Sequence, residues 1–355
     1  MKKKLLSVLL AAGMVMSLVA CGGSDKPADD KAADAADDAV KVCVVYSGNL
    51  GDKSYNDSCN MGSTKAQEDF GIELKTLEGT TADEWKANLL SACEDGYDLV
   101  ICSSSNFEEY LKEYAPMYPD VKFAIIDTTV PGDNIVSVSF AQNQGSFLAG
   151  AAAALFTTHT EVEGVNEDAV IGWVGGMDIP VLWDFYTGYE QGAKYINPDI
   201  TVLQSFAGTW NDPLKGKELT LAQYEQGADI VMNVASGTGP GILEGAKEAG
   251  NYAIGDDLTQ ANEQPGHVLT SMVKRVDTAC YSVIESVVNG TFEGNSVSYL
   301  DLAVEGVSLT DFAVIKEALG DKFPEDILTQ LEEIEAKIVS GEIVVENFEG
   351  FGPQK

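Results

Sequence analysis

Acidic and amide side chains stand where predicted strands give way to loops. Asp52, Asn56 and Asp57 lie in a polar loop that follows an apolar run of β-branched residues. Asp127 ends the run FAIID, and Asp257 ends AIGDD. In open α/β sheets, ligands bind at the carboxyl ends of the strands, where loops and helix N-termini face outward. Because carboxylates and amides are hydrogen-bonding groups, the pattern predicts a site for a small polar molecule.

Other kinds of chemistry have little support in the sequence. The two histidines, His159 and His267, are far apart, and the six cysteines show no short metal-ligand spacing. A zinc site is therefore not expected, and no Ser-His-Asp or Cys-His arrangement can be assembled. We expect no catalytic residue, no metal and no cofactor. Cys43 and Cys102 fall in predicted core strands, where a free thiol packs as a small apolar group. A structural disulfide is the alternative for the cysteines.

The first strand, loop and helix form a unit that recurs midway along the chain. Residues 41–46 predict a buried strand, and the loop after it enters a helix that Ser54 or Asn56 is placed to cap. In the second half, residues 169–174 predict a strand, 175–180 a loop and 181–195 a helix. Each unit presents a polar loop at the end of a strand.

The remaining chain alternates in the same way. Further strands are predicted at 72–77, 97–102, 122–127 and 135–140, and in the second half at 170–174, 200–206, 229–234, 252–255 and 267–273. The first helix is predicted over 59–70, an Ala-rich helix over 145–158, and an acidic helical tail over 310–340 with a break at Pro324. Apolar strands alternating with helices predict an α/β fold with parallel sheets covered on both faces. A single doubly wound domain is the alternative, but the repeated five-strand series favours two similar lobes with a ligand cleft between them.

The N-terminus has the pattern of an export signal. Lys2, Lys3 and Lys4 precede an apolar run, and small residues stand before Cys21, as in a secretory signal that ends in a bacterial lipobox. The run is too short for the ~20 residues that a membrane-spanning helix needs. We expect residues 1–20 to be a lipoprotein signal peptide, Cys21 to be the lipidated residue, and residues 21–39 to be an acidic flexible tether.

The length of the chain indicates the number of domains, and its charge excludes some kinds of partner. The 355 residues suggest about two domains. The formal net charge is −34. Binding to nucleic acid is not expected, because phosphate contacts need clustered Lys and Arg. The same charge argues against a protein that lies flat on anionic lipid.

Eight stretches with one order and spacing are also informative: GDKSYND (51–57), FAIID (123–127), VSFAQNQGSFLAG (138–150), GWVGGMDIP (172–180), NDPLKGKE (211–218), SGTGPG (236–241), AIGDD (253–257) and LTSMVKRVD (269–277). Together they resemble the basic-membrane-protein (BMP, or Med) family, which comprises substrate-binding lipoproteins of ABC importers, best known for purine nucleosides. The resemblance covers nearly all of residues 42–290. It implies a type I periplasmic-binding-protein fold in which three segments cross between the lobes. The expected N-terminal lobe is 40–148 plus 270–296, and the expected C-terminal lobe is 149–269 plus 297–355.

The resemblance also implies roles for the polar residues of the first lobe. The family's first loop faces the ligand, which points to Asp52, Asn56 and Asp57, although Asn56 or Asp57 would serve equally well as a helix cap. Asp127 stands where the family reads the base, and capping of the next turn is the alternative. Ser104, in the loop after the strand at 97–102, completes this part of the expected site.

In the second lobe, the resemblance places Asp257 on ribose hydroxyls. Asp256 replaces a residue that is commonly apolar in the family, so either carboxylate can be the inward one. Lys274 is expected on the ligand or a neighbouring carboxylate, and a surface lysine is the alternative. The tight turn around Gly237 allows the backbone to approach a ligand, or is a plain turn.

The sequence departs from the family at the aromatic positions. Asn60 and Asn106 stand where family members carry aromatic residues, and Thr259 replaces a usual acid. Because stacking contributes ~1–3 kcal/mol per base in nucleic-acid binders, another aromatic residue must cover the base if a nucleoside binds. The candidates are Tyr55, Phe107, Trp183 and Trp210, and each has core or rim packing as its alternative. Trp210 ranks first, because it follows a strand end in the second lobe.

We therefore expect a non-enzymatic receptor, lipid-anchored on the extracytoplasmic face of the cell membrane and monomeric. It would close on a small polar ligand, with a purine nucleoside favoured, and deliver it to the permease and ATPase of an ABC importer. One alternative is a receptor for a sugar or another polar metabolite. The other is a nucleoside-processing enzyme, which needs an acid–base pair or nucleophile near a glycosidic bond. The lipobox and the order of the motifs favour transport.

Overall fold

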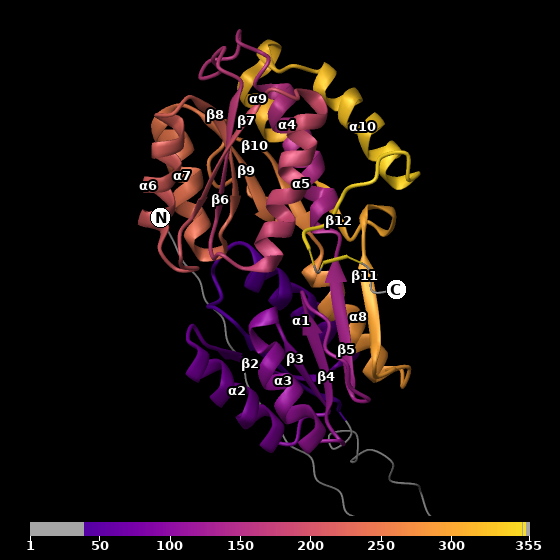
Figure 1. Ribbon diagram of the computed structural model, residues 1–355. Helices are drawn as coiled ribbons and strands as arrows, with labels where there is room; N and C mark the ends of the chain where they lie inside the picture. The colour runs from indigo at the N-terminus through magenta and orange to yellow at the C-terminus, as the bar shows by residue number, and fades with distance from the viewer. Residues whose placement is uncertain (1–38, 350, 353–355) are drawn as a thin grey trace, which may run out of the picture. The chain divides into compact units, whose positions relative to one another are not determined.

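The computed structural model describes residues 39–349, 351 and 352 (Figure 1). The expected signal peptide, Cys21 and all but the last residue of the expected tether lie outside the described residues. Within the described part of the chain, none of the helices combines the length and the hydrophobicity required to cross a membrane.

The first lobe is built on a six-stranded sheet in the order β11-β5-β4-β3-β1-β2, and all neighbouring strands are parallel. Its strands are β1 (Lys41–Tyr46), β2 (Glu73–Glu78), β3 (Leu99–Cys102), β4 (Lys122–Ile126), β5 (Ile135–Phe140) and β11 (Ser296–Leu300). Its helices are α1 (Tyr55–Phe70), α2 (Ala82–Glu94), α3 (Glu108–Tyr114) and α8 (Val276–Val288). Central strands such as β3 are buried along their whole length, as expected for a parallel sheet with helices on both faces.

The second lobe repeats this plan with the order β12-β10-β9-β8-β6-β7. Its strands are β6 (Val170–Gly175), β7 (Thr201–Phe206), β8 (Ala228–Val234), β9 (Tyr252–Asp257), β10 (Val268–Lys274) and β12 (Val307–Leu309), of which β12 alone runs antiparallel to its neighbour. Its helices include α4 (Gln142–Phe156), α5 (Pro180–Ile196), α6 (Pro213–Tyr224) and α7 (Gly239–Ala249). The prediction of two similar α/β lobes is confirmed, and each sheet has one strand more than the predicted series.

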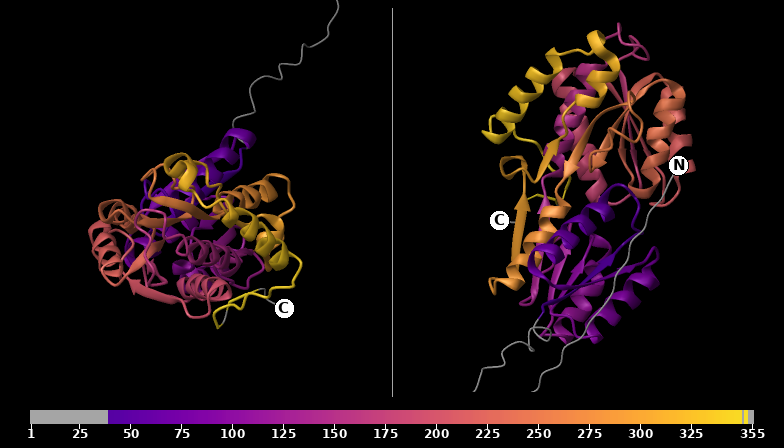
Figure 2. Two further views of the ribbon diagram at one scale, coloured as in Figure 1. Left: turned by 90° about the horizontal axis from the view of Figure 1, so that it is seen from above. Right: turned by 180° about the vertical axis from the view of Figure 1, so that it is seen from behind.

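The chain crosses between the lobes near residues 141, 275 and 301, which corrects the expected boundaries at 148, 269 and 296. The whole of α4 packs against α5, and a Cβ on Gly150 would lie only 2.0 Å from the carbonyl oxygen of Tyr189. Such a close approach of two backbones ties α4 to the second lobe. β10 is also part of the second lobe because it pairs with β9, whereas β11 pairs with β5 in the first. Figure 2 shows α8 and β11, in orange, beside the indigo and purple first lobe.

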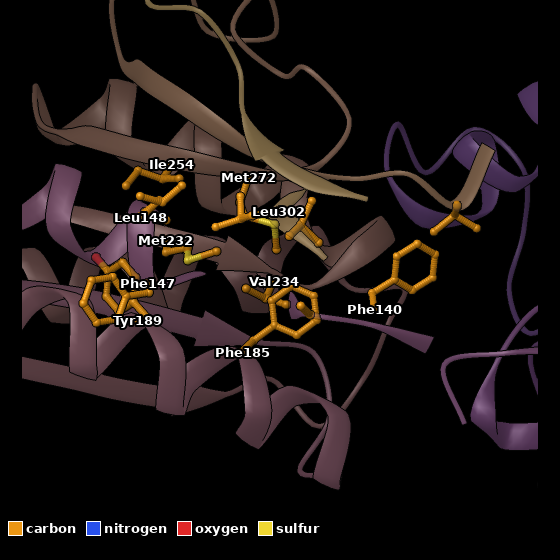
Figure 3. Close-up of a cluster of buried hydrophobic side chains, with 14 of the residues drawn as sticks. Phe140, Phe147, Leu148, Phe185, Tyr189, Met232, Val234, Ile254, Met272 and Leu302 are labelled. Atoms are coloured by element: carbon orange, nitrogen blue, oxygen red, sulfur yellow. The ribbon is translucent and has the colours of Figure 1, made fainter. Parts of the chain in front are cut away.

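The core of the second lobe lies between its sheet and the α4–α5 pair. Figure 3 shows Phe147 and Leu148 of α4 and Tyr189 of α5 near Met232 of β8 and Met272 of β10. All five side chains are buried. Burial of this apolar surface holds the strand ends of the lobe in fixed positions.

The last part of the chain covers the second lobe. In place of one helical tail over 310–340, there are α9 (Ala313–Leu319) and α10 (Asp326–Val339), and the predicted break at Pro324 separates them. Figure 1 shows both helices in yellow on the lobe that contains α4. The residues beyond α10 return to α5, where the Asp184 carboxylate accepts hydrogen bonds from the backbone N–H of Phe348 and the side chain of Asn347.

The remaining ordered turns are short 3-10 helices. They are η1 (Ser105–Phe107), η2 (Ala115–Met117), η3 (Ser236–Thr238), η4 (Leu302–Val304) and η5 (Gly320–Lys322). Two of them, η1 and η3, follow β3 and β8 and therefore lie at the carboxyl ends of the two sheets.

Candidate functional site

The first loop is organised by Asp52. The helix begins at Tyr55, four residues earlier than predicted, and Ser54 occupies its N-cap position without capping it through its side chain. The Asp52 carboxylate caps it instead, accepting hydrogen bonds from the backbone N–H groups of Ser54, Asn56 and Asp57 at 3.0, 2.9 and 3.1 Å. The expected cap, Ser54 or Asn56, is therefore wrong. A carboxylate supplies both the hydrogen-bond acceptors and the negative charge that a helix N-terminus favours.

Asp57 also stabilises this loop. Its carboxylate accepts hydrogen bonds from the backbone N–H groups of Gly51 at 2.7 Å and Lys53 at 2.9 Å. These contacts hold Lys53 in a left-handed conformation with φ of 55°. The carboxylates of Asp52 and Asp57 thus shape the loop, and neither residue lines the cavity described next.

A cavity of about 650 Å³, which includes the space open to solvent, lies at the carboxyl ends of both sheets. It brings together eight of the residues predicted from the sequence: Tyr55, Asn56, Ser104, Asn106, Asp127, Trp210, Asp257 and Lys274. Its volume falls within the usual range for small-molecule sites, roughly 300–1,000 Å³. The predicted cleft between the lobes is therefore present.

Asn60, Trp183 and Gly237 lie outside the lining. Asn60 accepts a hydrogen bond from the Tyr46 hydroxyl at 3.2 Å, one turn along α1 from the cavity-lining Asn56. Trp183 donates to Asp178 and stacks on Phe348, with ring centroids 6.0 Å apart. A Cβ on Gly237 would lie 2.9 Å from the backbone oxygen of Trp210, which places this residue behind the cavity wall.

Because Asn60 lies outside the cavity, the absence of an aromatic residue at position 60 does not remove a stacking surface from the site. Because residue 60 does not face the cavity, its amide leaves the apolar wall of the site intact. Tyr55, Phe185 and Trp210 supply that wall. The Trp210 ring lies against Gly176, where a Cβ would approach the ring to 2.3 Å, so only glycine leaves room for it there.

Lys274 is the buried cation of the site. Its ammonium pairs with the Asp127 carboxylate at 2.5 Å, and both side chains are buried. The ammonium also lies over the rings of Tyr55, Phe140 and Phe185, 5.0–5.3 Å from their centroids. Desolvated cation–π contacts of this kind are favourable by up to about 2 kcal/mol. The predicted pairing with a neighbouring carboxylate is confirmed, and the surface alternative is wrong.

Asp256 and Asp257 form an acidic end of the cavity. They are 2% and 3% exposed, and both line the cavity. Burial raises the pKa of Asp257 to about 7. Burial, and then the neighbouring Asp257, raise the pKa of Asp256 well above its ordinary value. Oδ1 of Asp256 has no hydrogen-bond partner among the described residues, and an unpaired buried polar atom costs roughly 1–3 kcal/mol. A ligand donor at this position would satisfy it.

The backbone is strained at three strand ends around the cavity. Asp127 after β4, Ser236 after β8 and Asp257 at the end of β9 have φ of 70°, 47° and 62°. Left-handed conformations are unfavourable for residues other than glycine and gather at functional sites. The strain turns these side chains out of the sheets and toward the cavity edge.

The first loop also bridges the two lobes. Ser54 donates to Asp257 at 2.5 Å, and Ser236 donates to Asp52 at 2.8 Å. Lys53 extends this bridge, because its backbone oxygen accepts from the side chain of Gln260 at 3.0 Å and its ammonium pairs with Glu263. These contacts, with the Lys274–Asp127 pair, hold the lobes together around the cavity.

Sequence reasoning missed part of the lining. The missed residues include an apolar group at the start of α5 and several small polar residues: Ser47, Gly48, Ser105, Ile179, Val181, Leu182, Phe185, Asn211, Val234 and Ser236. The loop at 175–180 could have been predicted to face the cavity, because it belongs to a strand–loop–helix unit like that of the first lobe. The apolar residues after it have the pattern of an ordinary amphipathic helix, so their contact with the cavity could not be predicted.

Comparison with known proteins agrees with this geometry. Residues 39–349 match the family of ABC transporter substrate-binding proteins described as PnrA-like. Basic membrane protein A of Borreliella burgdorferi is 30% identical, covering 99% of this chain and 98% of the relative. An uncharacterized lipoprotein of Pyrococcus abyssi is 30% identical, with 97% and 92% covered.

A solved structure is similar as well. The solute-binding protein of an ABC transporter system from Aeropyrum pernix superimposes with a TM-score of 0.79 at 29% identity, covering 86% of this chain and 94% of that one. A glucose-galactose binding protein from Geobacillus stearothermophilus has a TM-score of 0.56 at 15% identity, which is a likeness of fold alone. Both are consistent with the type I periplasmic-binding-protein fold.

The family consists of solute-binding proteins and not of enzymes. Two lobes with a cavity at the carboxyl ends of their sheets, the family match over 39–349 and the similarity across nearly the whole length of these relatives all agree. This chain belongs to the PnrA-like family of ABC transporter substrate-binding proteins.

Proposed function

We propose that this protein binds a purine nucleoside as a monomer and presents it to the permease and ATPase of an ABC importer. The observation that carries the proposal is the composition of the cavity, in which an aromatic wall stands beside buried carboxylates and amides. A nucleoside has the matching parts, because its base is flat and apolar on both faces and its edge and ribose carry hydrogen-bonding groups.

The two ends of the cavity suggest an orientation. Asp256 and Asp257 are acceptors for ribose hydroxyls, and Asp257 already accepts one hydroxyl hydrogen bond, from Ser54. Asn56, Asn106 and Asp127 are available to the edge of a base. Trp210 would then cover one face of the base, in place of the aromatic residue that the sequence lacks at position 106.

Calorimetric titration with a panel of compounds tests this function. Adenosine, guanosine and inosine should bind, and free ribose, glucose and galactose should not, because a sugar alone leaves the aromatic wall uncovered. A free purine base should bind weakly, because it leaves Asp256 and Asp257 without donors. If a sugar binds tightly and no nucleoside gives heat, the nucleoside assignment fails while the solute-binding family assignment is unaffected.

Replacement of Trp210 should weaken nucleoside binding. Trp210→Ala removes one stacking surface, which contributes ~1–3 kcal/mol, so we expect a Kd about 5- to 150-fold higher by calorimetry. The order of preference among nucleosides that differ only in the sugar should not change. Trp183→Ala is the matched control, because Trp183 lies outside the cavity, and it should bind as the wild type does. Equal losses in the two variants would contradict the role of Trp210.

We further propose that lipid on Cys21 holds the protein on the extracytoplasmic face of the cell membrane. Relatives that match this chain over more than nine-tenths of their length bear the names lipoprotein and basic membrane protein, which supports this location. Cys21→Ser should move the protein from the membrane fraction to the aqueous fraction, because the acceptor of the lipid is gone. Immunoblots of fractionated cells measure the shift, and a variant that stays on the membrane at the wild-type level would contradict the anchor.

A further inference from the structure

Two buried cysteines from distant parts of the chain meet within the first lobe. The sulfur atoms of Cys59 on α1 and Cys280 on α8 are 3.0 Å apart, although 221 residues separate them in the sequence. Both side chains are completely buried. A separation this short exceeds a disulfide bond by only about 1 Å, so a small shift of the side chains would join them.

The two helices are already packed closely enough for a covalent link. A Cβ on Gly62 of α1 would lie 2.0 Å from the backbone oxygen of Asp277 on α8. One turn earlier, the backbone N–H of Asp277 donates to the Ser58 hydroxyl at 3.2 Å. These contacts lie next to both cysteines along their helices, and they fix the distance between the helices at the point where the thiols meet.

The other cysteines provide an internal contrast. Cys43, Cys93 and Cys102 are also buried, and they lie near one another on β1, α2 and β3. Among the described residues, Cys59 and Cys280 are the one pair whose sulfur atoms are in contact. Of the five buried cysteines, the geometry therefore favours a bond between Cys59 and Cys280.

We propose that Cys59 and Cys280 form a structural disulfide when the protein folds in contact with a disulfide oxidant. The two thiols lose two protons and two electrons, one S–S bond forms, and the oxidant disulfide is reduced to two thiols. Disulfides persist outside the cytoplasm, so in the cell this step rests on the extracytoplasmic location proposed above. With purified protein, the oxidant is supplied and the location does not matter.

The environment indicates when the bond would form. The hydrogen bond with Cys280, followed by burial, holds the pKa of the Cys59 thiol well above its usual range. Since the thiolate is the reactive form, the folded reduced pair should react slowly. The bond is therefore expected to form while α1 and α8 are still coming together, before the lobe closes over the sulfur atoms.

The disulfide would join two parts of the ligand site. The first turn of α1 carries Tyr55 and Asn56, and α8 begins two residues after Lys274. A covalent link one turn further along both helices would keep these residues in register. The link closes a very long loop, which restricts the unfolded chain strongly.

Peptide mapping of the full chain, refolded with a mixture of reduced and oxidised glutathione, tests the proposal. Free thiols are blocked with iodoacetamide before trypsin digestion. A disulfide should link peptide 54–65 to peptide 276–316, and the peptides 42–53 and 87–112, which carry Cys43, Cys93 and Cys102, should be alkylated. Alkylation of Cys59 and Cys280 in that sample, or a link within 87–112, would overturn the proposal.

Thermal unfolding provides a second readout. Dithiothreitol should lower the Tm of the oxidised wild type by about 5 °C, and it should not change the Tm of Cys280→Ser. Cys93→Ala is the matched control, a buried cysteine without a sulfur neighbour in contact, and it should keep the full response to dithiothreitol. If Cys280→Ser does not fold, the peptide map of the wild type decides alone. An unchanged Tm of the wild type on reduction would contradict a structural disulfide.

Discussion

Replacement of Lys274 by methionine should abolish ligand binding and destabilise the fold. Methionine has a side chain of similar length, which can still pack among the aromatic rings of Tyr55, Phe140 and Phe185. It lacks the positive charge that pairs with Asp127. Loss of one partner from a buried ion pair costs about 3–5 kcal/mol, because the other charge is left unpaired. Asp256 and Asp257, which lie in the same cavity, would also lose the positive charge of Lys274, which lowers their pKa values.

Chemical denaturation and calorimetry measure the two effects on this variant. Arg275→Met is the matched control, since it removes the next cation in the sequence, which is partly exposed and paired with Asp277. A surface pair contributes only ~0–1 kcal/mol, so this control should be close to the wild type. Addition of Asp127→Asn to the Lys274 variant should recover stability, because the unpaired charge is gone. A Lys274 variant as stable as the Arg275 variant would show that the buried pair is not a main support of the fold.

The ligand-free protein should be more stable at pH 5 than at pH 7.5. Burial raises the pKa values of Asp184 and Asp229 to about 6 and that of Asp257 to about 7, and burial together with the neighbouring Asp257 raises that of Asp256 well above its ordinary value. Between pH 4 and these values, the unfolded chain has lost protons that the folded chain retains. The free energy of unfolding therefore falls as the pH rises through this window. For Asp184, a rise of about two units corresponds to roughly 3 kcal/mol.

Urea denaturation at several pH values measures this slope. Asp184→Asn should flatten it between pH 4 and 6, because one of the carboxyl groups that retains its proton is gone. Asp57→Asn is the control, because Asp57 is a loop carboxylate that accepts two backbone hydrogen bonds. The slope of this variant between pH 4 and 6 should equal that of the wild type. Stability that increases steadily from pH 5 to 7.5 would contradict the role of these buried carboxyl groups.

The fold could be predicted because its signals are local. The apolar runs of β1, β3 and β8 and the polar loops after them are visible in the sequence, and they give two parallel lobes. The strands β11 and β12 were missed, since SVSYL and VSL are short and partly exposed. Their pairing with β5 and β10 depends on the path of the chain between the lobes, which no local pattern carries.

The site was predictable at the ends of strands and not on helix faces. Asp127, Asp257 and Trp210 follow strands, and all three line the cavity. Asn60 was misjudged because it lies one helical turn beyond Asn56, about 6 Å further along the axis of α1, whereas only the first turn of this helix reaches the cavity. Phe185 belongs to the cavity only because the α4–α5 pair holds it against the ends of the strands, a tertiary contact.

The late strands β11 and β12, which complete the two sheets after the chain has crossed between the lobes, affect the order in which the protein folds. β11 completes the edge of the first sheet beside β5, yet 155 residues of the chain lie between the two strands, and α8 of that lobe is almost as late. Contacts that span such long segments form slowly, because the intervening chain must first be ordered. A nascent chain that ends before residue 296 has an unpaired edge at β5, which is a surface for aggregation. Neither lobe can therefore complete its sheet until most of the polypeptide has been synthesised, and survival of the newly made chain should depend on chaperones that keep that edge covered.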